Sequence, residues 1–348
     1  MTILLNIQEK VQCEILPVIR PKWRDSFQLG INALSLIPFC SLNGNARVVG
    51  GSNGIMQMYR LVRKDLSSVF TLIMAKLFKI TDDSFINIDF TIFDPFAVLC
   101  LALQTQVGRA IPVWIETLKY PIKKDSQNIF ILESLKKFIK IVGCKFKIVA
   151  DRGFIGEYLI NGFTDLGLTF YVRMKAGKSV IRELKNKDKI TNLNKIKWLD
   201  FECIIYGHKL RVIRSSTTLQ KKLNASECWY IITNDFETSR ETILDVYYHR
   251  FEIEEAFKDL KHVFNMNQNY FKRKETIEAI IWFQILGFWL LWLTSHIPKL
   301  KEEIRINIKK QLSWFKQAWE QLMRERIQPI IPICNYKFRR LGGLVKNV

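Results

Sequence analysis

The stretch that decides the fold is DVYYHRFEIEEAFKDLK, residues 245–261. Four of its polar residues follow one another at intervals of three, four and seven: Tyr247, Arg250, Glu254 and Lys261. At about 100° per residue, the spacing predicts a helix with these four side chains in one narrow stripe. Apolar residues fill the neighbouring sector, whereas Glu252, Glu255 and Asp259 point the other way. Glu254 therefore lies at the border of the buried face, where a carboxylate is costly unless a cation compensates it.

Two further acids lie in or next to apolar strands. Asp89 interrupts the run INIDF, and Asp151 follows the run FKIVA, although aspartate is a poor strand residue. For Asp151, capping of a turn explains the position as well as metal ligation does. For Asp89 a cap is harder to argue, because the strand continues to Phe93. Taken alone, the pattern favours an ordinary salt-bridged amphipathic helix, and the two aspartates shift the balance toward a site.

The charge balance points to a polyanionic partner. The chain has 53 Lys and Arg against 33 Asp and Glu, which gives a formal net charge of +20. Because 48% of its 348 residues are hydrophobic, a packed interior is available and the surplus charge must lie mostly on the surface. Such a surface attracts nucleic acid or an anionic membrane face.

Asp89, Asp151 and Glu254 would form a hard, oxygen-only donor set, which suits Mg²⁺ or Mn²⁺. Seven cysteines without a CxxC pair indicate neither a disulfide framework nor a zinc site, so we expect reduced thiols and a cytoplasmic protein without a signal peptide. A carboxylate site in a basic protein predicts two-metal phosphoryl transfer on a phosphate polymer.

The pattern of apolar runs predicts an α/β fold. Three consecutive strands are expected between residues 85 and 118, and strands then alternate with helices, which implies a mixed sheet flanked by helices. We expect a helical N-terminal domain at 1–75, a catalytic domain at 76–296 with a β-rich insertion at about 176–227, and a basic tail at 297–348. The apolar stretch 279–293 is shorter than a membrane span and reads as a buried core helix.

The spacing Tyr247-x2-Arg250-x3-Glu254-x6-Lys261 resembles the signature of bacterial insertion-sequence DDE transposases of the family-four type, which are named for these four residues. Asp89 and the ADRGF context of Asp151 are similar to the other two members of the family's catalytic triad. The resemblance covers about residues 45–295.

The resemblance implies a ribonuclease-H-like core that cleaves DNA and joins its ends with two Mg²⁺ ions per site, for which Mn²⁺ can substitute. Its expected partners are double-stranded DNA, namely the terminal inverted repeats and the target, and a second copy of the chain in the synaptic complex. The N-terminal domain would bind the element ends, and the protein would be nucleoid-associated. The implied DNA-contacting residues are Tyr247, Arg250, Lys261, Arg173, Lys175 and Trp229.

Trp229 precedes the glutamate helix, in the strand WYIITND. In the family, a tryptophan at this place stabilises a flipped base, and an aromatic face can recover part of the unstacking energy. Simple core packing of Trp229 is an equally good interpretation.

Three other functions compete with a transposase. A nuclease with the same core would cleave DNA without joining ends, and the triad does not separate these two. A catalytically retired copy would bind DNA only, although every core catalytic position is present. A peripheral membrane protein would use the apolar stretch and the basic tail to bind anionic vesicles.

Overall fold

The computed structural model describes residues 3–35, 41–105, 108–123, 126–175, 179–184, 187–195, 198–216, 228–262, 271–295 and 320–322. These residues form two compact units, one made of Met1–Leu61 and Phe283–Val348 and the other of Val62–Trp282. The predicted basic tail, 297–348, lies outside the described residues except for 320–322. The three predicted domains stay a prediction.

The first unit is helical in its described part. Its helices are α1 (Ile3–Lys10), α2 (Arg24–Gly30) and α3 (Leu42–Leu61), with short π- and 3₁₀-helical turns between α1 and α2 and a π-helical turn, Ile31–Ser35, after α2. Helix α3 is kinked at Gly51, whose φ of 61° is in the left-handed region that favours glycine. Phe27 of α2 packs on Phe283, with ring centroids 5.1 Å apart.

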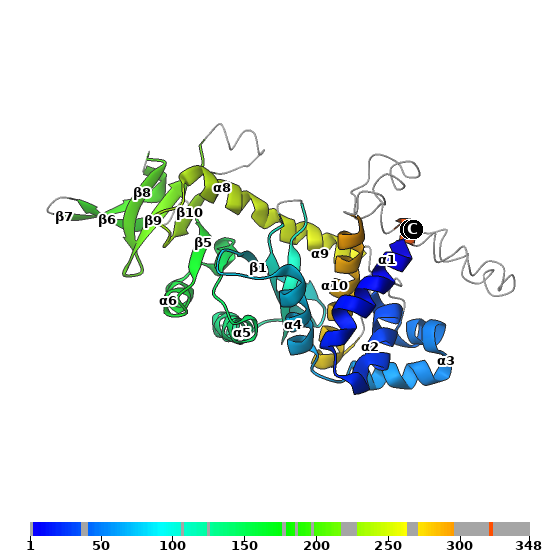
Figure 1. Ribbon diagram of the computed structural model, residues 1–348. Helices are drawn as coiled ribbons and strands as arrows, with labels where there is room; N and C mark the ends of the chain where they lie inside the picture. The colour runs from blue at the N-terminus through cyan, green and yellow to red at the C-terminus, as the bar shows by residue number, and fades with distance from the viewer. Residues whose placement is uncertain are drawn as a thin grey trace. The chain divides into compact units, whose positions relative to one another are not determined.

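The second unit is built on a mixed sheet of ten strands (Figure 1). The strands are β1 (Phe85–Phe93), β2 (Phe96–Leu103), β3 (Ile111–Lys119), β4 (Lys147–Ala150), β5 (Thr169–Met174), β6 (Ser179–Leu184), β7 (Lys187–Asn192), β8 (Asp200–Ile205), β9 (His208–Arg214) and β10 (Tyr230–Thr233). Their order is β3-β2-β1-β4-β5-β10-β9-β8-β6-β7. Strands β1, β4 and β5 are parallel, and the other pairs are antiparallel.

Helices cover this sheet, which confirms the predicted α/β class with a mixed sheet and flanking helices. The helices are α4 (Ser67–Phe78), α5 (Ser126–Val142), α6 (Glu157–Asp165), α8 (Arg240–Tyr248), α9 (Glu252–His262) and α10 (Lys274–Ser295), the last of which continues into the first unit. Figure 1 shows α4, α5 and α6 on one side of the sheet, away from α8 and α9. Strands β6 to β9 fall inside the predicted insertion range and join the main sheet through β9 and β10. That they form an insertion stays a prediction.

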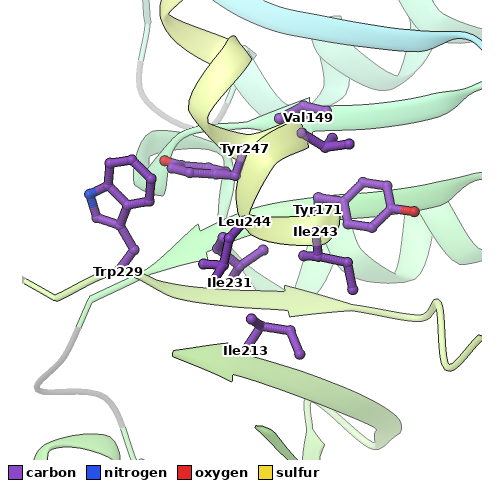
Figure 2. Packing of buried hydrophobic residues seen from close by; sticks show 9 residues of the cluster. Val149, Tyr171, Ile213, Trp229, Ile231, Ile243, Leu244 and Tyr247 are labelled. Carbon is purple, nitrogen blue, oxygen red and sulfur yellow. The ribbon is translucent and has the colours of Figure 1, made fainter. Parts of the chain in front are cut away.

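Helix α8 is held on the sheet by a cluster of buried side chains from β4, β5, β9 and β10 (Figure 2). The cluster consists of Val149, Tyr171, Ile213, Trp229, Ile231, Ile243, Leu244, Val246 and Tyr247. Tyr171 and Tyr247 are fully buried. Because burial of each large apolar side chain contributes about 1.5–3 kcal/mol, this cluster fixes the start of the segment 245–261 on the sheet.

Helix α10 is apolar on all sides. Within the described residues, Lys274–Leu293 is the one helix long and apolar enough to cross a membrane, and 89% of its most apolar window is buried inside the structure. Such burial is typical of the core helix that the sequence predicts. Length and composition alone are weak evidence for a membrane span.

The polar end of α10 is attached to β3 by a buried carboxylate. Glu278 accepts hydrogen bonds from the backbone nitrogen and the hydroxyl of Thr117, both at 2.7 Å. Burial raises the pKa of Glu278, and the charge of Lys274 and the Thr117 hydrogen bonds oppose the rise. Glu278 therefore provides the acceptor for an amide in the middle of a buried strand.

Glu278→Ala should lower the free energy of unfolding by about 1–3 kcal/mol, because the Thr117 amide loses its acceptor in a buried place. Urea unfolding of the variant and the wild type measures this loss. Glu275→Ala is the matched control, since Glu275 is exposed in the first turn of the same helix. Equal stability of the two variants would contradict the role of Glu278.

Candidate active site

The register of two parallel strands brings Asp89 and Asp151 together. Ile88 of β1 is paired with Ala150 of β4, so the next residue of each strand is one of the two aspartates. The Oδ1 atom of Asp89 accepts a hydrogen bond from the Phe90 nitrogen at 2.8 Å. Asp151 precedes a 3₁₀ turn, but its side chain makes no capping bond to that turn among the described residues. The capping interpretation of Asp151 therefore does not account for its side chain.

The segment 245–261 is two helices rather than the single long helix that its spacing predicts. The first of them, α8, begins after Ser239, whose hydroxyl caps the helix by accepting from the Thr242 nitrogen at 3.2 Å. Helix α8 ends at Tyr248, a 3₁₀ turn follows at His249–Phe251, and α9 begins at Glu252. The break occurs where side chains from the sheet bond to backbone carbonyl groups of the chain. Asn87 donates to the carbonyls of His249 and Arg250.

Arg250 lies in this break, between two of the predicted catalytic acids. Its side chain is 4% exposed, and its Nη2 atom donates to Glu254 Oε1 at 2.8 Å. Its Nη1 atom lies 4.0 Å from Asp89 Oδ2. The guanidinium also covers the ring of Phe251 at 4.5 Å from the centroid. The structure thus links a strand acid and a helix acid through one buried cation.

The charged groups around Asp89 all act on its pKa. Burial raises its pKa to about 6; the Phe90 amide and the Arg250 charge oppose the rise, whereas Glu254 and Asp151 add to it. Burial alone would lower the pKa of Arg250, but Tyr247, Asp151 and Glu254 raise it. The three carboxylates are therefore close enough to interact, and the positive charge of Arg250 compensates Asp89 only in part.

The donor set fits a hard cation in its chemistry, because it offers only carboxylate oxygens and the charge of the half-buried Asp89 is not fully compensated. In its arrangement, however, no three His, Cys, Asp or Glu of the described residues are placed to hold an ion together. The guanidinium of Arg250 lies against Glu254 instead. An ion held by all three acids would share Glu254 with Arg250.

Three more of the predicted residues lie at this group. Tyr247 is fully buried, and its hydroxyl donates to Asp151 Oδ1 at 3.3 Å. Burial raises the pKa of Tyr247, and the charges of Arg250 and Arg173 oppose the rise, so Arg173 of β5 is also near. Partial burial lowers the pKa of Lys261, and the charge of Asp89 opposes this decrease.

Lys175 is not brought into this group. It is exposed just beyond the end of β5, and no interaction with the three acids is found for it in the described part of the chain. A lysine at the rim of the group could still reach a phosphate backbone, because its side chain is long and flexible. Its DNA contact stays a prediction.

Trp229 is covered by its neighbours. It is 4% exposed, and its ring packs against Tyr247 at 5.1 Å between centroids (Figure 2). The ring of Phe251 lies 6.0 Å away on the same measure. This geometry is that of core packing. A contact with a flipped base would require the ring to be uncovered, and that role stays a prediction.

Three polar residues at the site escaped the sequence reasoning: Asn87, Gln104 and Glu252. The helical stripe put Glu252 on an outward side, whereas the structure buries it to 4% exposure. Asn87 carried a usable signal, because residues two apart on a strand share a face and Asn87 is two residues before Asp89. Gln104 carried none.

Comparison with known proteins supports the transposase interpretation. Residues 127–290 match the family model described as "Transposase DDE domain", and this range takes in Asp151, Glu254 and the other three residues of the helical signature. The match supports a DDE transposase. No curated protein matches the chain. Among solved structures, a piggyBac transposase synaptic complex with hairpin DNA is similar at 12% identity, covering 99% of this chain and 85% of that chain with a TM-score of 0.45, a likeness too low to carry an argument.

The packing of Tyr247 can be separated from its hydrogen bond to Asp151. Tyr247→Ala should lower the free energy of unfolding by about 3–5 kcal/mol, because a fully buried ring is removed. Tyr247→Phe should cost only about 0.5–1.5 kcal/mol, because it loses one hydrogen bond and keeps the ring. Chemical denaturation of both variants measures the difference. Similar losses in the two would mean that the ring is not packed as described.

Proposed function

We propose that the chain is the DNA transposase of a bacterial insertion sequence, which cleaves the ends of its element and joins them to target DNA. The observation that carries the proposal is the meeting of Asp89, Asp151 and Glu254 around Arg250, on adjacent strands and a helix. The family match over residues 127–290 supports it independently. The strand order β3-β2-β1-β4-β5 agrees with the ribonuclease-H-like core that such an enzyme would have.

In this proposal Asp89, Asp151 and Glu254 hold two divalent ions, Mg²⁺ or in its place Mn²⁺. Such ions, when bound, activate the attacking oxygen and stabilise the leaving oxygen of phosphoryl transfer. Lys261 binds phosphate oxygens beside the carboxylates, with Arg173 and Lys175 further along the backbone. Arg250, which is 4% exposed and bonded to Glu254, has to be uncovered before it binds a phosphate oxygen there. Tyr247 orients Asp151 through the hydrogen bond from its hydroxyl. These cationic contacts provide affinity and position, but little sequence information.

The proposed partners are double-stranded DNA, comprising the terminal inverted repeats and the target, and a second copy of the chain in the synaptic complex. The net charge of +20 supports a phosphate polymer as partner. We propose that the helical residues before the catalytic domain bind the element ends and that the protein works in the bacterial cytoplasm on nucleoid DNA.

A strand-transfer assay with Mg²⁺ tests the function, using the DNA that flanks the gene as donor and a labelled 3′-hydroxyl end. The wild type should give joined product, and Glu254→Gln should reduce its formation about a thousandfold or more, because several kcal/mol of transition-state stabilisation are lost. Glu241→Gln is the matched control, because Glu241 is exposed in the first turn of α8, where it pairs with Arg240.

The outcomes separate the competing functions. Cleavage without joining would favour a nuclease, and DNA binding without either reaction, with verified donor ends, would indicate a retired copy. Undiminished joining by Glu254→Gln would refute the assignment of the glutamate.

A further inference from the structure

The break between α8 and α9 is held by the side-chain amides of Asn87 and Gln104. Asn87 is fully buried on β1, and its Nδ2 atom donates to the carbonyls of His249 at 3.3 Å and Arg250 at 3.5 Å. Gln104, just beyond β2, donates from Nε2 to Asn87 Oδ1 at 2.7 Å and to the carbonyl of Val246 at 3.0 Å. These bonds satisfy backbone carbonyls at a place where the regular helical pattern is interrupted.

On the other side of the break, the carboxylate of Glu252 closes the loop between β2 and β3. Its Oε2 atom accepts from the Thr105 nitrogen at 3.0 Å, and its Oε1 atom accepts from the Gly108 nitrogen at 2.9 Å. Oε1 also lies 3.1 Å from His249 Nδ1. The backbone carbonyl of Glu252 accepts from the Ala110 nitrogen at 3.1 Å. A buried carboxylate is costly, and these donors compensate it.

The next loop residue extends the attachment along α9. Arg109 Nε pairs with Asp259 Oδ2 at 2.6 Å, and its Nη2 atom lies 4.0 Å from Glu255 Oε2. The loop is therefore bonded to the first and second turns of the helix that carries Glu254.

We call Asn87, Gln104 and Glu252 the junction clamp. Asn87 is two residues before Asp89 on β1, and Glu252 is two residues before Glu254. The clamp thus ties the strand that carries one acid to the helix that carries another, through bonds on both sides of the turn that carries Arg250. Without these bonds, apolar packing, the Arg250 ion pair and the Arg109–Asp259 pair would be left to set the distance between the strand acid and the helix acid.

We infer that the junction clamp positions Glu254 and Arg250 against Asp89, with Glu252 as its central positioning residue. The inference rests on the proposed function for the reaction it would serve. Glu252 acts through the backbone of α9 and of the loop, and does not itself contact DNA. Residues that support ligands in this way typically change activity by about 10–100-fold when they are replaced.

The test compares Glu252→Ala and Glu252→Gln with Glu241→Ala and Glu241→Gln, which make the same changes at an exposed position in the first turn of α8. Single-turnover DNA cleavage with Mg²⁺ is measured at saturating donor DNA, together with the Kd for that DNA. Glu252→Ala should cleave about 10–100-fold more slowly than wild type with an unchanged Kd. Glu252→Gln should be intermediate, because one amide oxygen can still accept one of the two loop amides. Both Glu241 variants should cleave like the wild type.

Hydrogen exchange of backbone amides, measured without DNA, gives a second readout that does not depend on activity. Exchange at residues 105, 108–110 and 249–262 should become faster in both Glu252 variants and stay unchanged in the Glu241 variants. Gln104→Leu removes the two hydrogen bonds from Gln104 Nε2 and leaves the Glu252 carboxylate in place, so it should also slow cleavage. This variant tests the inference if Glu252→Ala does not fold.

Two results would overturn the inference alone: an active wild type whose Glu252 variants cleave as fast as the Glu241 variants, or unchanged exchange at those residues. A slower rate that is matched by an equal loss of DNA affinity would also overturn it, because a positioning residue should change the rate and leave binding intact. A wild type that neither cleaves nor joins verified ends would overturn the proposed function, and this inference with it.

Discussion

The buried guanidinium of Arg250 is the charge on which the arrangement of the site depends. A charge with 4% of its side chain exposed is destabilising unless acids compensate it, and here Glu254 bonds to it from the following helical turn while Asp89 approaches from β1. The three carboxylates, which would otherwise repel one another, tolerate their closeness because this cation lies among them. The buried charge of Arg250 therefore requires β1 and the junction between α8 and α9 to lie close together. The same closeness brings the acids of the candidate site to one place.

Much of the site could be predicted from local sequence, because its acids are out of place locally. Asp89 in an apolar strand and Glu254 at the border of an apolar helical face are costly positions that call for a partner. The closeness of Asp89 and Asp151 could not be predicted in this way, since it depends on the pairing of β1 with β4 across some sixty residues of chain. The covering of Trp229 depends in the same way on Tyr247 and Phe251, which its own strand does not reveal.

The α/β class could be predicted because apolar runs of strand length alternate with helical periods. The break in the helix could not, because His249, Arg250 and Phe251 include neither glycine nor proline. The break is stabilised by the side-chain amides of Asn87 and Gln104, more than a hundred residues earlier in the chain. The addition of β10 next to β5, with four more strands beyond it, is likewise a long-range pairing that no local pattern encodes.

The central claim is that three acids from separate elements share one site for divalent ions. Iron-directed cleavage of the protein backbone tests it most directly. The full chain is loaded with Fe²⁺ in place of Mg²⁺, radicals are generated with ascorbate and peroxide, and the fragments are identified by mass spectrometry. We predict cuts beside residues 89, 151 and 254 that excess Mg²⁺ suppresses and Asp89→Asn removes. Cuts at unrelated places, or cuts that neither treatment changes, would contradict the account.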